Sequence, residues 1–147
     1  MEIGDIIEQV EAMGGVLTIR PQAGDGSPEI AWGDVFFYYA PDGVVPRGQP
    51  FATIVTKNYP DDESSRLDRP GVFRLNIAAS KGDFAEWAGQ EVDPSDVDVL
   101  FPHPVYGSVA WLSVVNPGAG TAEAVRDLLA AAHDRARGLH ERRRSTP

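Results

Sequence analysis

The chain has 147 residues, of which 42% are hydrophobic and 24% are charged, and this is enough to bury one core, so we expect one domain over residues 1–147. It contains no cysteine, which excludes disulfides, thiolate metal sites and a cysteine nucleophile. The net charge of the chain is −9, and residues 1–134 alone carry 21 acidic and 8 basic side chains, a net charge of −13. This acidic body disfavours nucleic acid as a partner.

Hydrophobic periodicity predicts the elements in chain order. Residues 3–13 place apolar side chains at helical spacing, and residues 16–20 alternate as a short strand. Strands are expected at 29–40, 51–57 and 72–78, with a long polar loop at 58–71. A short helix over 81–88, a last strand over 106–115 and a final helix from 121 onward complete the chain.

The order of these elements predicts an α+β fold. Helices flank a run of strands and do not alternate with them one to one. This arrangement is typical of one mostly antiparallel sheet with helices packed on one face.

The two ends of the chain carry further information. MEIGDIIEQV is acidic and amphipathic, so it lacks the basic and apolar regions of a signal peptide. No apolar run approaches the ~18 residues that a membrane span needs, so we expect a cytoplasmic protein with no membrane partner. Residues 135–147 hold five arginines and one glutamate, and we interpret them as a frayed basic tail of the last helix in preference to an arm for an anionic partner.

Period-two alternation assigns the strand side chains to two faces of the sheet. Aliphatic residues group on the face that the helices cover, whereas the other face collects aromatic and charged residues, a mixture that is typical of a ligand cleft. The candidate ligand-binding residues are Trp32, Asp34, Tyr38, Lys57, Arg74, Asn76, Tyr106 and Trp111. The alternative, which we favour slightly, is a solvated face on which Arg74 and Lys57 pair with Asp34 or Asp61.

The stretch FPHPVYGSVAW, residues 101–111, holds His103 between two prolines. An imidazole titrates near neutrality, so His103 is the candidate catalytic acid or base. The prolines fix the backbone on both sides, which equally suits a rigid lead-in to the last strand. Because no partner triad is visible, we favour the structural role.

Other motifs give weaker signals. The histidines lack the spacing of metal ligands, and the sequence has neither a serine elbow nor a Walker lysine, so we expect no metal and no cofactor. The acidic run at 61–63 could bind a divalent cation but is more typical of a solvated loop. The residues GAGT, 118–121, could offer backbone N–H groups to an anion at a helix start.

Four motifs carry a family resemblance: WGDVFFYYAPDG, FATIVTKNYPDD, RPGVFRLNIA and FPHPVYGSVAWLSVVNP. Together they resemble an uncharacterised bacterial family, largely actinobacterial, of single domains of about this size without an assigned activity. A more distant resemblance is to the YjbR/MmcQ-like proteins, which share the order of elements and a Tyr-x-x-x-x-Trp last strand, here Tyr106 to Trp111. That resemblance implies a CyaY-like α+β fold. Its DNA-binding label fits poorly with an acidic body.

Three functional hypotheses follow. The first is a small-molecule-binding domain that uses the aromatic and polar sheet face, with a small organic molecule as the partner. The second is a small enzyme without a cofactor, in which His103 is the acid or base and Arg74 or Lys57 holds an anionic substrate. The third and weakest is a protein-interaction or DNA-binding module of the YjbR type. A homodimer is compatible with each of them.

Overall fold

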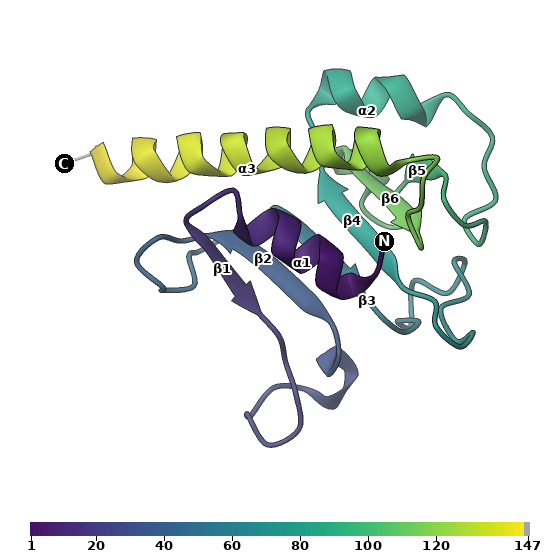
Figure 1. The fold of residues 1–147 in the computed structure, drawn as a ribbon, viewed down its shortest axis with the longest axis horizontal. Helices are drawn as coiled ribbons and strands as arrows, with labels where there is room; N and C mark the ends of the chain where they lie inside the picture. The colour runs from purple at the N-terminus through teal and green to yellow at the C-terminus, as the bar shows by residue number, and fades with distance from the viewer. Residues whose placement is uncertain (146–147) are drawn as a thin grey trace.

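The computed structural model describes residues 1–145 and contains one six-stranded sheet and three α-helices (Figure 1). The elements are α1 (Ile3–Glu11), β1 (Val16–Ile19), β2 (Val35–Tyr39), β3 (Ala52–Val55), β4 (Arg74–Ala78), α2 (Lys81–Ala88), β5 (Leu100–Pro102), β6 (Trp111–Val115) and α3 (Ala122–Ser145). Two short 3-10 helices, η1 (Glu29–Ala31) and η2 (Gly107–Val109), precede β2 and β6.

The sheet has the strand order β1-β2-β3-β4-β6-β5, and every neighbouring pair is antiparallel. Helices α1 and α3 lie across one face of this sheet, and α2 lies beside its β5–β6 edge (Figure 1). Residues of all three helices pack against one hydrophobic core. The predicted α+β fold, with one antiparallel sheet and helices on one face, is therefore confirmed.

The core explains why the helices lie where they do. In α1 the side chains of Ile6, Ile7 and Val10 recur at helical spacing and are all buried. In α3, Val125 and Leu129 project onto the same core, which also receives aliphatic side chains from β2, β3, β4 and β6. Apolar burial of this kind stabilises a fold by about 25 cal/mol per Å².

Two strands begin well after their predicted starts, and one strand was missed. The strand expected over 29–40 begins only at Val35, because η1 and the turn at Gly33 (φ 89°) precede it. The strand expected over 106–115 begins at Trp111, because Ala110 has a left-handed backbone (φ 68°) that interrupts an extended chain. Strand β5 was not predicted, since it is only three residues long and follows an acidic stretch that is typical of a connector.

The side of the sheet away from α1 and α3 is called the second face here. On this face the pairing register places five residues of five strands next to one another: Phe36, Thr53, Asn76, Ser113 and Phe101. The alternation of side chains in the sequence predicts the same face for Asn76. The expectation that this face is open is wrong around β4 and β6.

There the loop 58–71 crosses the second face. Its Leu67 packs with Phe101 and Val115, so that Arg74 and Asn76 are only 1% and 2% exposed. A loop rich in Asp, Glu and Ser gives no sign in the sequence that it covers part of a sheet.

The helices and the basic end of the chain bear on two further expectations from the sequence. Within residues 1–145, none of the helices combines the length and apolar character that a membrane span requires. The basic stretch 135–147 belongs to α3 as far as Ser145, while residues 146–147 lie outside the described residues. Fraying of this end of the helix stays a prediction.

Candidate functional site

A buried cluster of polar side chains on the second face centres on Arg74. Its Nη1 donates to Asp62 Oδ1 (2.8 Å) and to Ser65 Oγ (3.1 Å), and its Nε donates to Asn76 Oδ1 (2.8 Å). Its Nη2 donates to Asp62 Oδ2 and lies 3.2 Å from Nε2 of His103. Four of the five N–H groups of the guanidinium therefore donate to an oxygen atom, and the contact with Asp62 is the bidentate fork that arginine makes with a carboxylate.

Asn76 extends this cluster across the sheet. Its Oδ1 accepts a hydrogen bond from Ser113 Oγ (2.8 Å) as well as from Arg74, and its Nδ2 donates to Thr53 Oγ1 (3.0 Å). The pairing register explains the contact, since Thr53, Asn76 and Ser113 lie side by side on β3, β4 and β6. Buried polar groups that are all paired fix one arrangement of side chains, and this chain of bonds orients the guanidinium.

His103 approaches the cluster from the segment that follows β5. Its Nδ1 accepts hydrogen bonds from the backbone N–H groups of Val105 and Tyr106, both at 3.0 Å. The neutral imidazole therefore carries its proton on Nε2, which lies 3.9 Å from Asp62 Oδ2. Burial, together with the charge of Arg74, lowers the pKa of His103 to about 4, although the charge of Asp62 opposes both effects. At neutral pH the ring is consequently uncharged.

Asp62 is the anion of the cluster, and it comes from the loop 58–71. Burial alone would raise the pKa of this carboxyl, but the hydrogen bonds and charge of Arg74 outweigh burial and hold the pKa below its ordinary value. The side chain of Asp62 is 11% exposed against 1% for that of Arg74. The carboxylate thus lies between the buried guanidinium and the solvent.

A second polar cluster surrounds Asp34, which is fully buried. Its Oδ1 accepts hydrogen bonds from Thr56 N (2.9 Å), Thr56 Oγ1 (2.9 Å) and Lys57 Nζ (3.0 Å), and its Oδ2 accepts from the hydroxyl of Tyr59. Burial, together with Asp34, raises the pKa of Tyr59 above its ordinary value. Tyr59 and Asp62 exchange backbone hydrogen bonds (3.3 and 2.9 Å), so the loop joins this cluster to that of Arg74.

The structure brings some of the predicted site residues together and leaves others apart. Arg74, Asn76 and His103 form one cluster, while Lys57 joins Asp34 and the carbonyl oxygen of Trp32 (2.7 Å) in the other. The alternative pairing of Lys57 with Asp34 is therefore observed, whereas Arg74 pairs with Asp62 and not with Asp61.

The remaining aromatic candidates lie at the margins. Tyr106 is 56% exposed, and its ring centroid lies 4.9 Å from that of His103. Trp111 opens β6 opposite Ala78, and Tyr38 pairs with Leu17 near the other edge of the sheet. Among residues 1–145 the side chains of Trp111 and Tyr38 make no hydrogen bond in the two polar clusters, although the backbone carbonyl of Trp111 accepts from His103 N (2.9 Å).

Sequence reasoning missed several members of these clusters: Thr53, Tyr59, Asp62, Ser65 and Ser113. The alternation of side chains already places Thr53 and Ser113 on the same face as Asn76, so the sequence contained a signal for these two residues. The loop residues carried no such signal, because an irregular loop has no periodicity from which its direction could be inferred.

The start of α3 does not leave its amides free for an external anion. Asp98 accepts hydrogen bonds from the N–H groups of Gly118 (2.8 Å), Gly120 (2.9 Å) and Thr121 (3.1 Å) and from the Thr121 hydroxyl (2.6 Å). Burial alone would raise the pKa of Asp98, but these bonds, led by that of the Thr121 hydroxyl, outweigh it and lower the pKa. A Cβ atom at Gly120 would lie 2.7 Å from Asp98 Oδ2, so the turn needs glycine there.

Metal binding has no candidate geometry in the described chain. Within residues 1–145 no three His, Asp or Glu side chains converge in a way that could hold a metal ion. In the acidic run at 61–63, Asp62 turns inward to Arg74.

Comparison with known proteins places the chain in a family. A family model matches residues 1–145, which is nearly the whole chain. The chain belongs to DUF6194, a family of unknown function. No curated protein and no solved structure matches it. For this DUF6194 member the expected membership of a family without an assigned activity is confirmed, and a more specific function has to be argued from the two polar clusters.

Proposed function

We propose that this protein binds a small organic anion at Arg74 on the second face of the sheet, with the loop 58–71 as a movable cover. One observation carries the proposal: a guanidinium that is 1% exposed takes its carboxylate partner from a loop and not from the sheet that holds it. In the bound form the carboxylate of a ligand takes the place of the Asp62 carboxylate.

The energetics of buried ion pairs support a functional role for Arg74. Moving a cation out of water costs several kcal/mol, and well-packed apolar residues often stabilise a core as much as a buried ion pair does. The neighbouring core positions on β4, Leu75 and Ile77, are aliphatic. An arginine at position 74 is consequently not required to fill the space, whereas anion recognition does require it.

The way in which the loop is attached supports its role as a cover. Apart from the Tyr59–Asp62 bridge, its described bonds come mainly from side chains, such as Leu67 N to Asn58 Oδ1 (2.9 Å) and Arg69 Nη2 to the Ser95 carbonyl (2.9 Å). A segment without ladder hydrogen bonds opens at a lower free-energy cost than a strand does. Opening of the loop would withdraw Asp62 and expose the guanidinium.

The enzyme hypothesis gains less support. A base with a pKa of about 4 accepts a proton weakly at neutral pH, and two backbone amides occupy Nδ1 of His103. We assign His103 instead to positioning, since its ring lies against Nη2 of Arg74. The DNA-binding alternative conflicts with the acidic body.

Origin, cellular location and distant kinship are proposed on the basis of the sequence. A bacterial origin and a distant kinship with the YjbR/MmcQ-like proteins rest on the sequence resemblances, and the order of helices and antiparallel strands is compatible with that kinship. A cytoplasmic location rests on the acidic, amphipathic N-terminal stretch. One domain over residues 1–147 and a homodimer also stay predictions.

The test uses a variant with space for an added anion. Asp62→Ala removes the internal carboxylate and leaves Arg74 without its counterion. We expect sodium acetate, at an ionic strength matched with sodium chloride, to raise the melting temperature of this variant, because acetate binds the folded state alone. In the wild-type protein a screen of small carboxylates should contain compounds that shift the amide NMR signals of residues 58–71.

The matched control is Asp134→Ala, which removes the carboxylate of the exposed ion pair with Arg137 (2.7 Å). Acetate should stabilise this variant no more than chloride does. If acetate has no specific effect on Asp62→Ala, Arg74 is not a site for small anions. If no carboxylate perturbs the loop of the wild-type protein, the proposed function is wrong even if the variant responds.

A further inference from the structure

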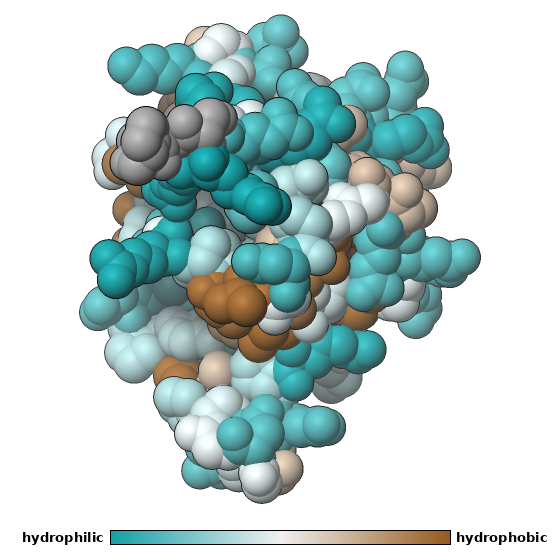
Figure 2. Space-filling view, turned by 90° about the vertical axis from the view of Figure 1, so that its left-hand side faces the viewer, coloured by the Kyte–Doolittle hydropathy of each residue, from teal (hydrophilic) through white to brown (hydrophobic). Residues whose placement is uncertain are grey.

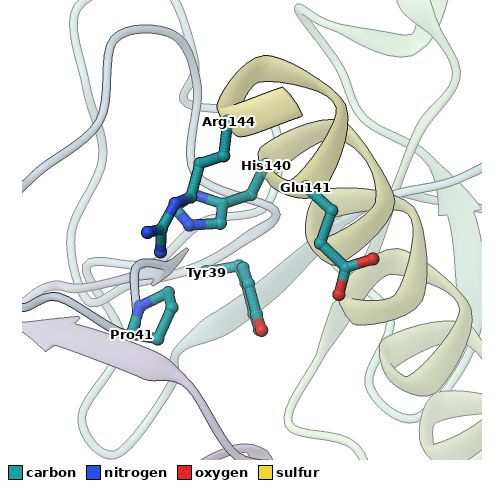
Figure 3. A pocket seen from close by; sticks show the side chains of 5 residues that line it. All are labelled: Tyr39, Pro41, His140, Glu141 and Arg144. Carbon is teal, nitrogen blue, oxygen red and sulfur yellow. The ribbon is translucent and has the colours of Figure 1, made fainter. Parts of the chain in front are cut away.

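We infer that a hollow at the C-terminal end of α3 is a second binding site, for a small aromatic ring that carries an anionic group. It is independent of the Arg74 cluster and shares no residue with it. Tyr39 and Pro41, at the end of β2, face His140, Glu141 and Arg144 of α3 across this hollow (Figure 3). Its volume of about 390 Å³ lies within the range of small-molecule sites.

The two histidines of α3 both contact Tyr39 at this hollow, but they differ in their hydrogen bonding. Both rings lie edge-on to Tyr39, with centroids 5.3 Å away. Nε2 of His133 lies 2.7 Å from the carbonyl oxygen of Gly14 and donates to it. Nε2 of His140 is buried but has no hydrogen-bond partner among residues 1–145. Buried polar atoms are normally paired, so Nε2 of His140 is available to form a hydrogen bond with a ligand.

The charges around the hollow determine the kind of partner. A smaller hollow that shares Tyr39 and His140 is lined by Arg47 and Arg143, so three arginines and the single carboxylate of Glu141 border the combined surface. The rest of the molecule is acidic, with a net charge of −13 over residues 1–134. An anion therefore finds its most favourable potential at this end of α3.

The shape of the lining selects a flat ligand. Three of the lining side chains of the larger hollow are rings, and the side chains of Arg144 and His140 both come from α3 (Figure 3). Flat groups stack on aromatic rings and on guanidinium planes. Figure 2, which faces this end of the molecule, shows hydrophilic surface around the end of α3 and hydrophobic surface next to it. This combination suits a ligand with one apolar and one charged end.

The geometry gives each end of the ligand a partner. Arg144 is exposed, so its side chain can turn outward at little cost and bind a carboxylate or phosphate oxygen. The inferred site requires that this movement makes Nε2 of His140 accessible, so that it donates to the same anionic group. The ring of the ligand lies in the hollow between Tyr39 and Pro41.

The experiment is an NMR titration of the full chain with phenyl phosphate. Inorganic phosphate supplies the anion alone, and benzyl alcohol supplies the ring alone. We expect phenyl phosphate to shift the signals of Tyr39 and His140 and to bind at least about tenfold more tightly than either comparator. Arg144→Gln and His140→Phe should each weaken it by about tenfold, since His140→Phe keeps the ring packing and removes only the nitrogen.

The matched control is Arg137→Gln, on the same helix but outside both hollows, which should bind phenyl phosphate as the wild type does. Asp62→Ala should also leave this binding unchanged, which separates the two sites. The inference is overturned if phenyl phosphate leaves Tyr39 and His140 unshifted, if both comparators bind equally well, or if Arg144→Gln and His140→Phe retain wild-type affinity.

Discussion

Removing the carboxylate of Asp62 should cost this protein a large part of its stability. In Asp62→Ala the guanidinium of Arg74 keeps its contacts with Ser65, Asn76 and His103, but both bonds to a carboxylate are lost. A buried charge left without its partner typically costs 3–5 kcal/mol, and we expect about 3 kcal/mol because the Asp62 side chain, at 11% exposure, lies where water can enter. At this chain length that loss lowers the melting temperature by roughly 10 °C.

The assay is urea unfolding, followed by the fluorescence of the three tryptophans and by circular dichroism. A double-mutant cycle with Arg74→Met isolates the pair, because Arg74→Met/Asp62→Ala no longer buries a charge and should recover at least half of the loss. Asp134→Ala should change stability by less than about 1 kcal/mol, as is typical of an exposed ion pair. A loss below about 1 kcal/mol for Asp62→Ala, or no coupling in the cycle, would refute the role of Asp62 as the counterion.

Three further predictions concern the rest of the fold. Asp98→Ala should lower the free energy of unfolding by about 2 kcal/mol in urea, and the difference should shrink as the pH falls below about 4, because the wild-type carboxylate becomes protonated there; an unchanged stability at pH 7 would contradict the capping role. An NMR titration of the His103 ring should give a pKa of about 4, and stability should rise between pH 4 and about 6.5, where the unfolded chain binds a proton that the folded chain does not; a measured pKa above 6 would contradict this. Gly15→Ala should destabilise the protein by more than about 1 kcal/mol in thermal unfolding, because Gly15 has a φ of 68° and a Cβ there would lie 2.6 Å from the Tyr39 ring. The control is Gly43→Ala, which measures the backbone cost alone, because Gly43 has a φ of 76° and no atom lies within 4 Å of the added Cβ.

The sheet could be predicted from the sequence to the extent that alternation governs it. Leu75 and Ile77 alternate with Arg74 and Asn76 along β4, and the pairing register places the two sets on opposite faces. Strand β5 escaped prediction because three residues are too few to show a period.

The candidate site could be predicted only in part, because one of its members comes from a loop that has no periodic pattern. Arg74, Asn76 and His103 were named from the sequence and contact one another directly, but the carboxylate that completes the cluster, Asp62, comes from the loop 58–71. The direction of Asp62 follows from tertiary contacts of the loop, such as the packing of Leu67 on Phe101, and not from any local pattern. The aromatic residues Tyr38 and Trp111 were grouped with the site by face alone, and a face several strands wide does not specify contact.

The bonds of Asp98 have a consequence for engineering this chain. This one carboxylate, two positions before β5, binds the turn that leads into the last helix, so the start of the helix and the edge strand are held together. Inserted residues in the connector around 90–95 would lengthen a surface segment and leave that fastening intact. An insertion between Asp98 and Leu100, or within 118–121, would separate the carboxylate from its donors. A split of the chain into two complementing fragments would therefore be placed before Asp98, which keeps both halves of the fastening on one piece.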